Sequence, residues 1–84
     1  MYSESKESNS NASVKAIAML KKEGLNAYSG SKTLSYAEKI FNIGKKSFNS
    51  DVVSEAYDAL EELHDSVWGY SDKDKIWKYM MELV

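Results

Sequence analysis

The side chains in this sequence that are best suited to recognition chemistry are carboxylates. Five acidic residues recur at spacings of four, three, four and three: Asp51, Glu55, Asp58, Glu62 and Asp65. In an α-helix this rhythm places all of them on one face, about one turn apart. Between residues 51 and 65 there is no Lys or Arg, so nothing within the segment neutralises this acidic stripe. A row of carboxylates can imitate the spaced phosphates of a nucleic acid and bind a basic surface.

The acidic stripe also has a simpler explanation, and the sequence leaves both open. The outward face of an amphipathic helix is commonly charged, and the stripe can serve only to keep that face solvated. Like charges three or four residues apart repel by about 0.2–0.5 kcal/mol per pair, a cost that lysines at some of these positions would have removed. The two alternatives are therefore a solvated face and a docking face for a basic partner.

Groups suited to catalysis or metal binding are scarce. His64 is the single histidine, and cysteine is absent, so there is no thiol nucleophile. Glu61 and His64 have the spacing of one half of a di-iron carboxylate motif, but the sequence lacks the second half. No glycine-rich phosphate-binding loop is present. We expect no enzymatic activity, no metal and no cofactor, and we expect His64 to be a partly covered structural residue.

Large apolar side chains crowd the C-terminal segment. Residues 68–84 include Trp68, Tyr70 and Trp77 together with methionines and aliphatic residues. On a helix these apolar positions cover an arc of about 200°, wider than the roughly 100° that one packing face needs. The pattern favours core residues over an exposed anchor for a partner, a role to which Trp and Tyr are also well suited. A homodimer interface is a third alternative.

Lysines dominate the first half of the chain. Residues 12–50 carry seven lysines and two glutamates, a local charge of +5, and residues 51–65 carry six acids and no base. Six lysines form a candidate basic patch: Lys15, Lys21, Lys22, Lys39, Lys45 and Lys46. Arginine, the residue best suited to reading bases and phosphates, is absent. We expect these lysines to solubilise the surface or to pair with the acidic helix, and nucleic-acid binding is the alternative.

The overall pattern predicts a small all-α protein. The 84 residues are enough for one domain. We expect a disordered polar tail over residues 1–11 and a single helical domain over residues 12–84, folded as a compact bundle of three to four short helices. The absence of proline and the lack of alternating apolar residues argue against strands. No internal repeat is evident.

Capping signals set the expected helix boundaries, which are residues 13–24, 35–48, 50–68 and 71–84. Gly24 is expected in the left-handed conformation that ends a helix. Ser35 and Glu38 have the spacing of a capping box that opens the second helix. Gly44 either permits close approach of a neighbouring helix or ends the second helix early. The ten or so residues that then separate the first two helices are too many for a helix-turn-helix motif.

The expected location is the cytoplasm. No stretch of the sequence approaches the roughly 18 apolar residues of a membrane span, and the N-terminus lacks the apolar core of a signal peptide. The absence of cysteine is compatible with a reducing compartment.

The leading hypothesis is a small acidic protein that binds another protein and is not an enzyme. The acidic stripe would occlude a basic surface that normally holds nucleic acid, and Trp68, Tyr70 and Trp77 would supply an apolar anchor. The concrete form is an inhibitor, antagonist or immunity protein of microbial or phage origin, with a nuclease or another nucleic-acid-binding protein as partner. Two alternatives are a dimeric transcription regulator that uses the Lys-rich helices of residues 13–48, and a structural subunit that forms oligomers.

Overall fold

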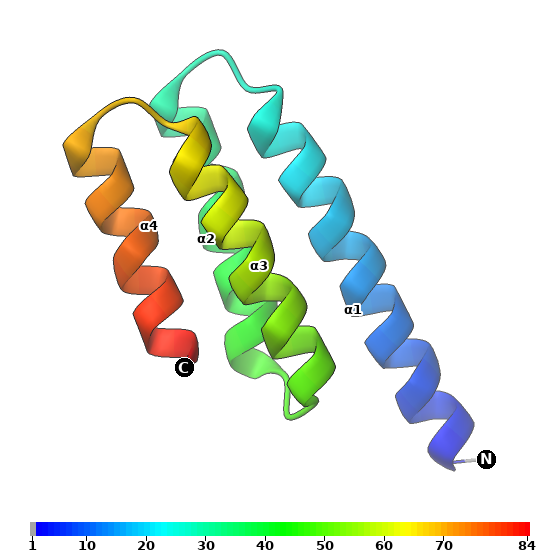
Figure 1. Ribbon diagram of the computed structural model, residues 1–84. Coiled ribbons are helices and arrows are strands. Elements are labelled where there is room, and N and C mark those ends of the chain that lie inside the picture. The colour runs from blue at the N-terminus through cyan, green and yellow to red at the C-terminus, as the bar shows by residue number, and fades with distance from the viewer. Residues whose placement is uncertain (1) are drawn as a thin grey trace.

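The protein is all-α, as the sequence predicts. The computed structural model describes the backbone of residues 2–84 and the side chains of residues 10–84, and in this part of the chain it contains no strand. Its four helices are α1 (Tyr2–Leu25), α2 (Gly30–Lys46), α3 (Ser50–Ser66) and α4 (Tyr70–Leu83) (Figure 1). The predicted disordered tail falls almost wholly on residues whose side chains lie outside this description, and it stays a prediction. None of the described helices is long and apolar enough to cross a membrane.

The last three helices begin at a constant interval of 20 residues, at Gly30, Ser50 and Tyr70. Each follows a residue in the extended conformation that serves as N-cap. The Ser29 hydroxyl accepts a hydrogen bond from the Lys32 amide, and the Asn49 side chain accepts from two amides of the first turn of α3. Such caps satisfy amides that have no partner within the helix. The predicted cap of α3 is therefore confirmed.

The predicted start of α2 is wrong by five residues. α2 begins at Gly30 because Ser29 caps it, so the capping-box spacing of Ser35 and Glu38 lies inside the helix. The connection between α1 and α2 is then residues 26–29, which is short enough for a tight helical hairpin. The argument from loop length against a helix-turn-helix motif is removed with it. α3 also ends earlier than predicted, at Ser66.

Helices two apart in the chain lie side by side and run in the same direction. α1 meets α3 where Ser10 binds Asn49 and where Lys21 binds Glu62. α2 meets α4 where the Phe41 and Tyr79 rings stack at 4.8 Å. Because successive helices are antiparallel, the α3–α4 hairpin lies on the α1–α2 hairpin as a copy displaced by about 40 residues (Figure 1).

Two pairs of contacts repeat with this displacement. The Thr33 hydroxyl donates to the Gly24 carbonyl at 3.2 Å, and 40 residues later the Lys73 ammonium donates to the His64 carbonyl at 2.8 Å. Leu63 packs against Gly24, and 20 residues later Leu83 packs against Gly44. The chain is thus a stack of two helical hairpins, a repeat that sequence comparison within the chain does not reveal because few of the equivalent residues are identical.

The stack is open. α1 and α4 each contact α2 and α3 but, in the described part of the chain, not one another. The four helices therefore form a flat plate with α2 and α3 at its centre and α1 and α4 at its edges (Figure 1). The short Cα extents of 23 and 14 Å fit this arrangement, since packed helices lie about 8–10 Å apart. α3 faces solvent on one broad side of the plate and α2 on the other.

The core lies where the four helices meet. Its largest fully buried side chains are Ile17, Ile40, Val52, Leu60, Leu63, Ile76 and Met80. The predicted apolar side of α3 is confirmed, since Ala56, Leu60 and Leu63 are buried. Phe48, which was predicted to lie on the apolar side of the second helix, is fully exposed because α2 ends at Lys46 and leaves Phe48 in the turn.

Glycine is needed in two helices for space and not for a turn. The prediction that Gly24 takes a left-handed conformation is wrong, because no described residue has a positive φ. A Cβ at Gly24 would stand 2.7 Å from Leu63, and a Cβ at Gly44 would stand 2.8 Å from the Cβ of Ala56. Of the two predicted roles of Gly44, close approach of a neighbouring helix is therefore the correct one.

The Gly44→Ala variant tests this close approach. The added methyl group should push α2 from α3 and lower the free energy of unfolding by about 1–3 kcal/mol, despite the gain of about 1 kcal/mol that alanine brings to an exposed helix. The variant Gly44→Ala/Ala56→Gly moves the methyl group to the other helix and should recover most of the loss. Urea unfolding followed by circular dichroism measures both, and a more stable Gly44→Ala variant would contradict the packing described here.

Candidate functional site

The acidic stripe lies on the broad side of the plate that α3 presents to solvent. All five of its carboxylate residues are exposed. They are held outward because the buried residues of α3, such as Ala56 and Leu63, occupy the opposite side of the helix. The Asn49 cap and the negative charge of Asp51 in the first turn favour the start of this helix. The sequence thus predicts the orientation of the stripe correctly.

One carboxylate of the stripe is neutralised from another helix. The Lys21 ammonium of α1 lies 2.8 Å from the Glu62 carboxylate, and both side chains are partly exposed. Such a surface pair contributes about 0–1 kcal/mol to stability. Asp65 lies 3.3 Å from the His64 ring, an ion pair only when the ring is protonated. Within the described side chains, Asp51, Glu55 and Asp58 form no ion pair.

The predicted aromatic residues divide into two groups. Trp68 and Tyr70 flank the turn between α3 and α4 and are 96% and 90% exposed, so they are not core residues. They stand beyond the end of α3 at which Asp65 completes the stripe. Trp77 is 47% exposed and lies on α4 with its ring centroid 6.2 Å from that of His64. Since His64 lies well around α3 from the stripe, the structure joins Trp68 and Tyr70 to the end of the stripe but separates Trp77 from it.

His64 is a partly covered residue, as predicted. Its ring lines an open depression of about 470 Å³ with Tyr70, Lys73, Asp74 and Trp77. The backbone carbonyl of His64 accepts the Lys73 ammonium at the end of α3, where a cation also stabilises the helix dipole. Within the described part of the chain, no group of three or more His, Asp and Glu side chains is placed to hold a metal ion.

The structure does not gather the six lysines into one patch. Lys21 turns toward α3 and binds Glu62, whereas Lys45 turns toward α4 and lies 3.4 Å from Glu82. Lys39 lies over the Tyr36 ring, and the Lys45 ammonium also lies over the Phe41 ring. Lys15, Lys22, Lys39 and Lys46 are exposed on α1 and α2. The lysines therefore point in several directions, and two of them are engaged with acids of the same chain.

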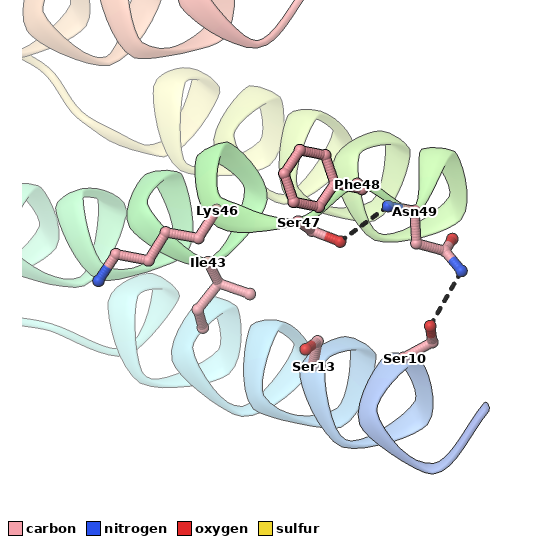
Figure 2. A pocket seen from close by; sticks show the side chains of 7 residues that line it. All are labelled: Ser10, Ser13, Ile43, Lys46, Ser47, Phe48 and Asn49. Carbon is pink, nitrogen blue, oxygen red and sulfur yellow. Dashed lines mark hydrogen bonds between the residues drawn. The ribbon is translucent and has the colours of Figure 1, made fainter. Parts of the chain in front are cut away.

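A pocket of about 650 Å³ lies between α1 and the turn from α2 to α3. Figure 2 shows its lining: Ser10, Ser13, Ile43, Lys46, Ser47, Phe48 and Asn49. Asn49 donates to the Ser10 hydroxyl at 2.9 Å through its side chain and to the Ser47 hydroxyl at 3.1 Å through its backbone amide (Figure 2). The Lys46 ammonium points away from the serines (Figure 2). No base is therefore placed to activate a serine in this pocket.

A shifted pKa is found away from these groups. Burial raises the pKa of the Tyr79 hydroxyl above its ordinary value, and the Glu38 carboxylate raises it further by repelling the phenolate. Because Tyr79 stacks on Phe41, this shift belongs to the packing of α2 and α4.

Comparisons with known proteins give no relative. No family model matches the chain, no curated protein matches it, and no solved structure matches it. The assignment of function therefore depends on the residues described above.

The exposure of the two tryptophans can be tested with variants that retain one each. Trp77→Phe leaves Trp68, whose emission should lie at the wavelength of a fully hydrated indole and be quenched strongly by acrylamide. Trp68→Phe leaves Trp77, which should be quenched less because its ring is half covered by α3 and α4. Equal quenching of the two variants in dilute solution would contradict the placement of Trp77.

Proposed function

We propose that the protein is a non-enzymatic binding module that docks the acidic stripe of α3 on a basic surface of another protein. The observation that carries the proposal is the state of the stripe. Asp51, Glu55 and Asp58 are exposed and without a described ion pair, although lysines are plentiful on the neighbouring helices. Lysines that could have neutralised the stripe at no cost instead bind Glu62 and Glu82. A solvated surface has no need of this separation of charge.

The spacing of the stripe suits a surface that holds nucleic acid. From the first to the fifth carboxylate the helix rises about 21 Å, at about 1.5 Å per residue. The stripe therefore offers about one negative charge every 5 Å, compared with about 3.4 Å of axis per phosphate on one strand of DNA. A basic groove built for a phosphate backbone would meet a similar row of charges on α3. Its occlusion is the mode of action of an inhibitor, antagonist or immunity protein, and a cytoplasmic protein of a microbe or phage fits this role.

Trp68 and Tyr70 supply what charge alone does not. Exposed ion pairs contribute little net affinity because both partners lose water. Large aromatic side chains that become buried at a contact contribute more and are common among the residues that dominate binding. Their position beyond Asp65, at the end of the stripe, allows one partner to contact both groups. The dispersion of the lysines gives less support to the alternative of a nucleic-acid-binding regulator.

A capture experiment with two charge-matched variants tests the proposal. In the stripe variant, Asp51→Asn, Glu55→Gln, Asp58→Asn and Asp65→Asn are combined. In the control, Glu23→Gln, Glu38→Gln, Asp74→Asn and Glu82→Gln are combined. Each variant loses four negative charges, which changes the formal charge from −2 to +2. All eight residues are exposed, so both variants should retain the helicity of the wild type.

The wild type and the control should retain the same basic protein, and the stripe variant should lose it. For the wild type, the affinity should also fall steeply as the salt concentration rises, because the contact is between charges. Retention of the same partner by the stripe variant, with the same dependence on salt, would show that the stripe is only a solvated face.

A further inference from the structure

The stack of helices has a vacant position at the α4 edge. α3 lies against α1 and α2, and α4 lies against α2 and α3. By the same displacement the next helix would lie against α3 and α4, where the described chain has none. In arrays of this kind each repeat contacts only its neighbours, and a terminal repeat needs a polar outer face to stay soluble. The α4 edge does not have such a face.

Apolar side chains line the vacant position, which we call the tail face. Its members are Val53, Tyr57 and Glu61 on α3 together with Trp77, Met81 and Val84 on α4. Trp77, Met81 and Val84 are exposed, and Val53 and Tyr57 are half-buried. A groove of about 400 Å³ between the two helices is lined mainly by Val53, Tyr57, Leu83 and Val84. At the other end, Trp77 lines the second depression with His64.

The α1 edge carries the surface that would begin such a stack, which we call the head face. The residues of α3 that lie toward α1 include Ala59, which is buried, and Glu62, which binds Lys21. Their equivalents 40 residues earlier are Met19 and Lys22. Met19 is 69% exposed and Lys22 is also exposed. An apolar side chain and a lysine therefore stand uncovered where the second hairpin buries an alanine and forms an ion pair.

The charges of the two faces are complementary. Between the two hairpins, Lys21 of the first binds Glu62 of the second at 2.8 Å. The equivalent of Lys21 in the second hairpin is Glu61, and the equivalent of Glu62 in the first hairpin is Lys22. If the head face of a second copy lay on the tail face, Lys22 of that copy would meet Glu61 with the two signs exchanged. The pair would again be an attraction, and Lys39 on α2 would add positive charge to the same edge.

We propose that the head face of one copy of the protein binds the tail face of another, so that copies stack end to end and continue the array of helices. The second copy fits better than a copy related by a two-fold axis. A two-fold contact at the tail face would bring the acidic α3 against another α3, or against α4, whose Asp74 and Lys78 already pair at 3.2 Å. Head and tail are different surfaces, so the assembly is open and grows with concentration.

The stack leaves the acidic stripe accessible. The stripe faces the broad side of the plate, whereas the head and tail faces are its edges. A stack of copies would therefore present its stripes side by side along one surface. This assembly does not depend on the proposed function, and loss of stacking leaves the stripe of a single copy intact.

Two variants that each block one face test the proposal. Met19→Glu places a charge on the head face, and Met81→Glu places one on the tail face. Both residues are exposed, so the monomer should retain its helicity. Sedimentation velocity should show the wild type growing beyond a dimer as its concentration approaches about 1 mM, which detects interactions of about −4 kcal/mol. Each variant alone should remain a monomer, and an equimolar mixture should form a one-to-one dimer and stop there, because each variant supplies the face that the other lacks.

A charge exchange gives a second, independent test. Lys22→Glu and Glu61→Lys should each weaken stacking about tenfold, a loss of about 1.4 kcal/mol, and the combined variant should recover most of the wild-type association. A wild type that remains a monomer, or that stops at a dimer, would overturn the proposal. So would a mixture of Met19→Glu and Met81→Glu that stays monomeric although both variants are folded, or a combined charge variant no better than either single one.

Discussion

The close approach of helices that are two apart in the chain is the constraint on which the rest of this structure depends. Gly24 and Gly44 leave room for Leu63 and Leu83, and the second of these contacts repeats the first 20 residues later. Close packing of side chains permits few alternatives once these positions are fixed. Because α3 is held against α1 and α4 against α2, the hairpins stack as displaced copies and do not close into a bundle in which α1 meets α4.

The open stack also decides where the charges lie. Its two central helices each expose one broad side, so the acids of α3 and the lysines of α2 face away from one another. Lysines that are close to acids across helices form pairs, as Lys21 does with Glu62. The remaining carboxylates of the stripe lie outside these contacts. The separation of charge seen along the sequence thus becomes a separation between surfaces, which is the property that a binding partner would recognise.

The parts of this account that depend on local sequence could be predicted, and the parts that depend on packing could not. The Asn49 cap and the outward stripe follow from signals within a few residues. The start of α2 was missed because Ser29 and Ser35 both resemble caps, and only the packing of Thr33 against Gly24 distinguishes them. Trp68 was expected in the core because its apolarity is a local property, whereas its exposure results from α3 ending at Ser66. The repeat of 40 residues is a property of geometry, since its matching positions hold different side chains, such as Thr33 and Lys73.

The distance between α1 and α4 tests the open stack most directly. Spin labels at Ala18 and Lys78, both exposed, would report it by pulsed electron resonance on dilute protein. In the open stack the axes of α1 and α4 lie about two helix widths apart, roughly 16–20 Å, and outward labels should add to that separation. In a closed bundle the two helices would be neighbours at about 8–10 Å. A distribution centred well above the distance for neighbours is the predicted result, and one at the distance for neighbours would contradict the account.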